Sequence, residues 1–141
     1  MTGPTLHPDP WRDVDAQPNA AQLATTLELR GRARPQMRLR RRFLRFARLR
    51  PGDAVLEVGC GTGVVLRDVA AMVGRRGHVV GVDSSLAILS VARKLCRRVQ
   101  GGPPITLRRA DGVKLPFAAG RFDAALAITV ILHVADPLKV V

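Results

Sequence analysis

The sequence contains no tyrosine, and aromatic side chains make up only 4% of its 141 residues. Proteins that hold single-stranded nucleic acid commonly stack bases on aromatic side chains, so this scarcity argues against an RNA-binding surface. The net charge of +12 argues the other way, because a strongly basic protein attracts polyanions. The positive charge comes from 20 arginines and only three lysines. We interpret the arginines mainly as a solvated basic surface and keep nucleic-acid binding as the alternative.

Cysteines and long apolar runs are also scarce. The two cysteines, Cys60 and Cys96, form no CxxC pair and no other metal-ligand spacing. We therefore expect free, reduced thiols and no metal site. The longest apolar run, residues 124–132, is far shorter than the ~20 residues that span a bilayer. The first 15 residues carry acids and no apolar core, unlike a secretory signal. These absences favour a cytoplasmic protein.

The chain divides into two parts with different patterns. Residues 1–50 are expected to form an irregular lead-in and a basic helical segment, and residues 51–141 a second, α/β domain. Within the first part, Asn19 and Gln22 have the spacing of a capping box that opens a helix near 20–30, and Gly31 is expected to end it. A second helix is predicted from Pro35, with a buried apolar stripe between arginines that comprises Leu39, Phe43, Leu44, Phe46 and Ala47.

From residue 51 onward, apolar runs alternate with helical patterns. Strands are predicted over residues 54–58, 78–83, 105–111 and 122–129, with helices after the first two. Strand and helix in alternation are typical of an α/β fold with a parallel sheet and right-handed crossovers. The fourth strand is apolar nearly throughout, which predicts burial on both of its faces.

The turn after the first strand, "VLEVGCGTG", raises the question of its ligand. Its glycines follow the pattern G-x-G-x-G, with Val64 at the place where a dinucleotide fingerprint has its last glycine. Glu57, just upstream, would repel a phosphate but suits a cation. Asp83, 20 residues after Gly63, stands at the end of the second strand, where an acid can accept hydrogen bonds from a ribose. A cationic ligand with a ribose fits all three features, which favours S-adenosylmethionine over NAD.

The second part resembles the class I S-adenosylmethionine-dependent methyltransferases, especially their quinone and small-molecule branch. The resemblance rests on "VLEVGCGTG", "VVGVDSS", "RRADGVKLPF" and "FDAALAITVILHVADP", which occur in the order of the family's motifs. It covers the chain from about Pro51 to the end. It implies a Rossmann-like fold, an open and mostly parallel sheet with helices on both faces. The family's sheet continues beyond a fourth strand, so the resemblance also implies a domain truncated at its C-terminus after about four strands.

The resemblance further implies which residues hold the cofactor. Gly59, Gly61 and Gly63 would let the backbone approach it, with main-chain contacts from Cys60 and Thr62 and with Glu57 near the methionine ammonium. Asp83 would hold the ribose diol, and the adenine and the methionine arm would be bordered by Ser84, Asp111, Gly112, Thr129 and Val130. Thr62, Ser84 and Asp111 also have purely structural readings, as turn or cap residues. Asp123 is expected to be structural.

His133 is the one histidine near the expected acceptor site, where it could act as a general base. A loop histidine held by packing is an equally good interpretation, and His7 and His78 are interpreted as structural. The expected function is methyl transfer to a small-molecule acceptor. The alternatives are an RNA-modifying methyltransferase and a cofactor-binding fragment without catalysis. The family's strand order would leave the fourth strand at the sheet edge, where self-association is possible.

Overall fold

The computed structural model describes residues 9–97, 99–134 and 136–140. Its centre is a parallel sheet of β1 (Ala54–Val58), β2 (His78–Asp83), β3 (Ile105–Arg109) and β4 (Ala124–Ala127), in the order β3-β2-β1-β4. This order confirms the expectation that the fourth strand lies at the sheet edge. His7 lies outside the described residues.

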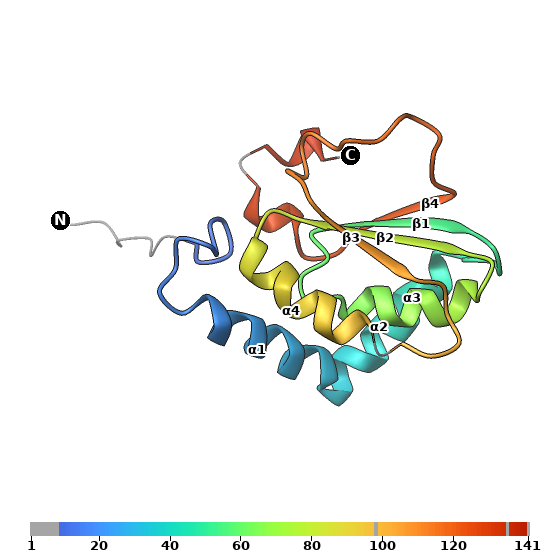
Figure 1. Ribbon diagram of the computed structural model, residues 1–141, viewed down its shortest axis with the longest axis horizontal. Helices are drawn as coiled ribbons and strands as arrows, with labels where there is room; N and C mark the ends of the chain where they lie inside the picture. Colours follow the sequence, from blue (N-terminus) through green and yellow to red (C-terminus); the bar gives the residue numbers. More distant parts are fainter. Residues whose placement is uncertain (1–8, 98, 135, 141) are drawn as a thin grey trace.

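Four α-helices pack on one side of this sheet (Figure 1). They are α1 (Ala20–Arg32), α2 (Arg34–Phe46), α3 (Val64–Val73) and α4 (Leu86–Cys96). The opposite side is covered by the segment between β3 and β4 and by two short 3-10 turns, η1 (Ile131–His133) and η2 (Pro137–Lys139). In the described ranges, no helix is long and apolar enough to cross a membrane.

The side chains of the central strands alternate between these two covers, as the two-residue period of a strand requires. Val55 and Val79 point to the helices, where they pack with Leu66, Val69, Val73 and Leu89. Leu56, Val58, Val80 and Val82 point to the other side and meet Phe117 and Phe122, whose rings touch edge to face with centroids 5.1 Å apart. Both faces of β1 and β2 are therefore buried, and Glu57 shares the helix side with Val55.

The edge strand β4 differs from its prediction. Its residues alternate between half-buried and exposed, so the expectation of burial on both faces was wrong. The reason is that β4 pairs only with β1 among the described residues, and that only Ala124 and Leu126 reach the core on the helix side. Asp123 is structural as expected, since its Oδ2 accepts from the Ala54 amide at 2.8 Å.

The N-terminal helices also differ in detail from the prediction. α1 begins at Ala20 but continues through Gly31, and the Asn19 side chain accepts no capping hydrogen bond. A Cβ at position 31 would lie 2.7 Å from a Val64 methyl, so glycine there permits close packing of α1 on α3 and does not end the helix. In α2, Leu39 and Phe46 are 57% and 76% exposed. At 3.6 residues per turn, both side chains point about 140–160° away from the buried Leu44, which faces the core.

Candidate functional site

The glycine loop between β1 and α3 is held in a conformation that excludes other residues at two points. Gly59 has a φ of +68°, and a Cβ there would lie 2.4 Å from a Val130 methyl. Gly63 has a φ of +80°, and its Cβ would meet the Cys96 sulfur at 2.6 Å. At both positions the left-handed backbone conformation and the lack of space for a Cβ atom favour glycine. Because glycine adopts this conformation without steric cost, the chain can turn sharply from β1 into α3. Cys60 and Cys96 are both buried and free, as expected.

Asp83 connects this loop to the end of β2. Its Oδ2 accepts from the Gly61 amide at 2.9 Å, and its Oδ1 accepts from the Ser85 amide at 3.0 Å. Burial raises the pKa of Asp83 above its ordinary value, and the two amide hydrogen bonds partly offset this rise. A carboxylate offers about four acceptor positions, so Asp83 keeps capacity for further donors.

Glu57 is the buried acid of the site. It is only 2% exposed, and its Oε2 has no hydrogen-bond partner among the described residues. Burial and the neighbouring Asp83 carboxylate hold the pKa of Glu57 well above its ordinary value of 4.5, while Arg40 opposes the shift. Buried polar atoms are almost always satisfied, so an unpartnered carboxylate oxygen beside a glycine loop favours a ligand with a positively charged donor.

A cavity of about 700 Å³ opens at the carboxyl ends of the strands. This is within the usual size of a small-molecule site, and it lies where open parallel sheets bind their ligands. The sequence-predicted residues that line it are Gly59, Gly61, Asp83, Ser84, Asp111, Gly112, Thr129, Val130 and His133. A smaller cavity of about 150 Å³ is lined by Glu57, Cys60 and Thr62 together with Gly59, Gly61 and Thr129. Gly63 lines neither cavity and instead caps α3.

Three of these residues have visible local roles. Asp111 accepts from the Val113 amide at 3.0 Å through Oδ1, so it caps a local backbone amide, which agrees with the cap role considered for it. Its second oxygen has no such bond in the described part of the chain. The Ser84 carbonyl accepts from Arg109 at 2.9 Å. Thr129 has a φ of +59°, a strained value for a threonine, directly at the cavity wall. Such strain is often found at ligand sites.

His133 lies on the cavity wall and is held by a residue far away in the sequence. Its Nδ1 lies 2.7 Å from Asp9 Oδ2, and its ring is 6.4 Å from the Trp11 ring. The hydrogen bond to His133 is the main reason why the pKa of Asp9 is lowered. The other ring nitrogen of His133, Nε2, makes no hydrogen bond within the described ranges.

The N-terminal lead-in contributes to the site in a way that sequence reasoning missed. Trp11 and Val14 line the large cavity next to Ile88. Asp15 caps the start of α4: it accepts from the Ser85 hydroxyl and from the amides of Leu86 and Ala87, at 2.9 and 3.1 Å for the two amides. These hydrogen bonds join residues about 70 positions apart, for which no local pattern exists in the sequence.

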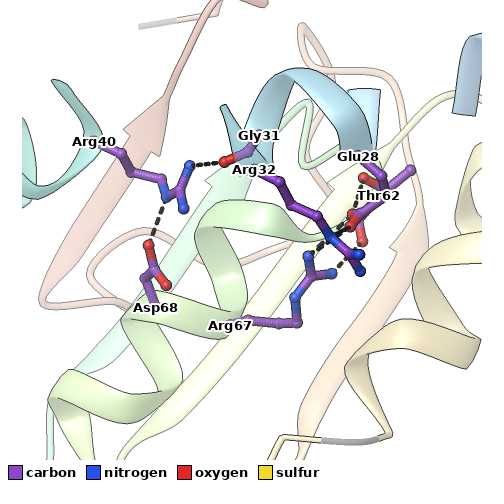
Figure 2. Close-up of polar contacts among 7 residues, drawn as sticks. All are labelled: Glu28, Gly31, Arg32, Arg40, Thr62, Arg67 and Asp68. Carbon is purple, nitrogen blue, oxygen red and sulfur yellow. Dashed lines mark hydrogen bonds and ion pairs between the residues drawn. The ribbon is translucent and has the colours of Figure 1, made fainter. Parts of the chain in front are cut away.

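A second missed feature links α1 to the glycine loop (Figure 2). Glu28 of α1 is 9% exposed and accepts from the Thr62 hydroxyl at 2.7 Å. Arg67 of α3 completes the contact with two bonds of 3.0 Å to the same carboxylate. A neighbouring pair, Arg40 with Asp68, ties α2 to α3, and Arg40 also donates to the Gly31 carbonyl at 2.9 Å.

Comparison with known proteins identifies the relatives of this chain. A family model described as a methyltransferase domain matches residues 55–141. The 2-phytyl-1,4-naphtoquinone methyltransferase of Synechococcus elongatus is 38% identical over 86 residues, which cover 61% of this chain and 37% of that protein. The demethylmenaquinone methyltransferase of Symbiobacterium thermophilum is 42% identical over 86 residues, covering 59% of this chain and 33% of the relative. The chain therefore spans about a third of the length of these curated relatives.

The fold comparison agrees. A crystal structure of an S-adenosylmethionine-dependent methyltransferase from Aquifex aeolicus superposes with a TM-score of 0.64 at 22% identity, over 72% of this chain and 53% of that one. The family match covers more than half of the sequence and includes the glycine loop, Asp83 and Asp111. The chain belongs to the methyltransferase-domain family and has the fold of the class I S-adenosylmethionine-dependent methyltransferases.

Proposed function

We propose that this chain binds S-adenosylmethionine across the large cavity and the smaller one, which share Gly59, Gly61 and Thr129, and belongs to an enzyme that transfers the cofactor's methyl group to a small-molecule acceptor. The observation that carries the proposal is the buried Oε2 of Glu57, a residue that lines the smaller cavity: this oxygen has no hydrogen-bond partner in the part of the chain that the structure describes. A dinucleotide would bring phosphates to this loop and would meet a carboxylate. An ammonium or sulfonium ligand would instead give the Glu57 oxygen a partner of opposite charge.

The residues that line the two cavities would have the following roles. Asp83, with its free acceptor capacity, would hold the ribose diol, and Asp111 would accept from the adenine amino group beside Ser84 and Gly112. Glu57 would accept from the methionine ammonium. The glycine loop with Cys60 and Thr62 would supply main-chain contacts, and Thr129 and Val130 would border the methionine arm. Residues 51–141 would form the cofactor-binding unit, and the described part of the N-terminal lead-in and helical segment, residues 9–50, would cover it.

The chemistry asks little of the protein's side chains. S-adenosylmethionine supplies an activated methyl group on a sulfonium. The residues that line the cavity would hold the acceptor in line with it and exclude water, and such alignment can contribute ~7–11 kcal/mol to catalysis. Where the acceptor must lose a proton, His133 would take it at Nε2 while Asp9 holds Nδ1. His133 would then be a catalytic residue, and Asp9 a positioning one.

The relatives narrow the acceptor class. The two curated relatives described above are named for methylation of 2-phytyl-1,4-naphthoquinone and of demethylmenaquinone. We propose an acceptor of the same kind, a small aromatic quinone or quinol, and prefer it to RNA because the cavity wall offers apolar side chains such as Trp11, Val14 and Leu132.

Calorimetric titration of the 141-residue chain with S-adenosylhomocysteine, and separately with NAD, tests the proposal. We expect S-adenosylhomocysteine to bind more tightly than NAD. Tighter binding of NAD would refute the cofactor assignment. A methyl-transfer assay with demethylated naphthoquinols and with an RNA pool then tests the acceptor, and methylation of RNA alone would overturn the quinone assignment.

A further inference from the structure

The bond between Glu28 and Thr62 ties the glycine loop to a helix outside the matched family region. Thr62 is buried, as is Glu28, and the two are 34 positions apart in the sequence. The Thr62 hydroxyl donates to Glu28 Oε1 at 2.7 Å (Figure 2). Next to it, Leu27 packs on Gly61, where a Cβ would lie 3.3 Å from the leucine methyl. α1 therefore lies directly against the middle of the loop.

Arg67 bonds to both Glu28 and Thr62, so the three residues are connected to one another. Its Nη2 donates to both Glu28 oxygens at 3.0 Å, and its Nη1 donates to the Thr62 carbonyl at 3.1 Å. Thr62 therefore hydrogen-bonds to two charged side chains: its hydroxyl donates to Glu28, and its carbonyl accepts from Arg67. Arg32, by contrast, approaches Glu28 only to 3.6 Å with a side chain that is 72% exposed. Exposed pairs of this kind contribute little.

The loop is consequently held from two sides. Asp83 fixes the Gly61 amide from the sheet, and Glu28 fixes Thr62 from α1. A glycine-rich loop loses much conformational entropy when it becomes ordered. Because Asp83 and Glu28 already order the centre of this loop, less conformational entropy is lost when a ligand binds. Buried ion pairs add little net stability compared with apolar packing, and their main effect here is geometric.

We propose that Glu28 is a positioning residue for cofactor binding: it holds the glycine loop in its binding conformation through Thr62 and Arg67, without touching the cofactor. This inference rests on the proposed function. It makes α1 part of the cofactor-binding machinery, although the family match begins only at residue 55.

Affinity for S-adenosylhomocysteine, measured by calorimetry, provides the first test. We expect Glu28→Gln and Thr62→Val each to weaken binding about tenfold, which corresponds to about 1.4 kcal/mol. Thr62→Ser keeps the hydroxyl that bonds to Glu28 and should therefore recover most of the affinity that Thr62→Val loses. Glu28→Gln removes the charge that pairs with Arg67, and Thr62→Val removes the hydroxyl that bonds to Glu28, so both changes act on the same connection and the double variant should also lose only about tenfold. A hundredfold loss would mean that the two residues act independently, and would overturn the inference.

Two controls separate positioning from a general loss of stability. Arg32→Gln removes the exposed partner of Glu28 and should leave the affinity unchanged. Ala24→Gly weakens the packing of α1 on α4 and should lower the melting temperature without changing the affinity of the folded protein. If Ala24→Gly reduces affinity as much as Glu28→Gln, the effect is stability alone and the inference fails.

Amide hydrogen exchange without ligand gives a second, independent readout. In Glu28→Gln, the amides of Gly61 and Gly63 should exchange about tenfold faster, while those of β1 should not change. Unchanged exchange at both glycines would overturn the inference. Failure of the proposed function is distinguishable, because in that case the original protein itself would not bind S-adenosylhomocysteine although its loop exchange responded to Glu28→Gln.

Discussion

Replacing Glu57 by glutamine should make the protein more stable and its cofactor binding weaker at the same time. The substitution keeps the size of the side chain and removes its charge. In the folded protein, Glu57 is buried and one of its oxygens has no partner in the described part of the chain. Removing an uncompensated buried charge should raise the free energy of unfolding by on the order of 1–3 kcal/mol near neutral pH.

The pH dependence of this gain has a defined sign. The pKa of Glu57 is raised in the folded state, so the folded protein holds this proton more tightly than the unfolded chain does. Stability from this group is therefore present below the ordinary value of 4.5 and is lost as the pH rises through the folded pKa. The advantage of Glu57→Gln should be small at pH 4.5 and should grow at higher pH.

Cofactor binding should change in the opposite direction. A charge-assisted hydrogen bond from an ammonium group is worth ~1.5–3 kcal/mol, so Glu57→Gln should weaken the binding of S-adenosylhomocysteine roughly 10- to 150-fold. In the original protein, affinity should rise with pH as Glu57 ionises, and the variant should lose most of this dependence.

Urea unfolding and calorimetric titration, each at pH 5 and pH 7.5, measure the two effects. Asp123→Asn is a matched control, because it makes the same acid-to-amide change at a carboxyl that bonds the Ala54 amide away from both cavities. It should not change the affinity. The reasoning about Glu57 is refuted if Glu57→Gln binds as tightly as the original protein, or if it lowers the free energy of unfolding at pH 7.5.

Three further predictions follow from the site and the surface. Asp83→Ala removes the acceptor of the Gly61 and Ser85 amides as well as the expected ribose contacts, so calorimetry should show at least a tenfold weaker S-adenosylhomocysteine affinity; an unchanged value in a folded sample would exclude the ribose assignment. Asp15→Ala removes the cap of α4 and should lower the free energy of unfolding, measured with urea at pH 7, by about 1 kcal/mol. Because the pKa of Asp15 is lowered in the folded state, this contribution should fade as the pH falls below 3.8. A difference that persists at pH 2 would contradict the capping role. RNA binding, measured by fluorescence anisotropy, should fall steeply with salt and show no sequence preference, whereas a selective complex at physiological salt would overturn the interpretation of the arginines as a solvated surface.

Much of the sheet and its glycine loop could be predicted from the sequence, because both depend on local pattern. Short apolar runs separated by glycine and proline define the strands, and backbone angles and close contacts at Gly59 and Gly63 explain why glycine stands there. The placement of Asp83 and Asp111 follows in turn from parallel strands, since their carboxyl ends meet at one edge of the sheet.

Only the tertiary structure decided which partners these residues have. A helical period showed that α2 has an apolar stripe, but its docking on the core through Leu44 left Phe46 exposed. In the sequence, nothing distinguishes Glu28 from other charged residues of a helix. In the structure it holds the glycine loop, because α1 packs against Thr62. Asp15 is likewise an acid in an irregular segment until it meets the start of α4. Hydrogen bonds between residues 34 to 72 positions apart leave no local period in a sequence, so their partners are set by packing alone.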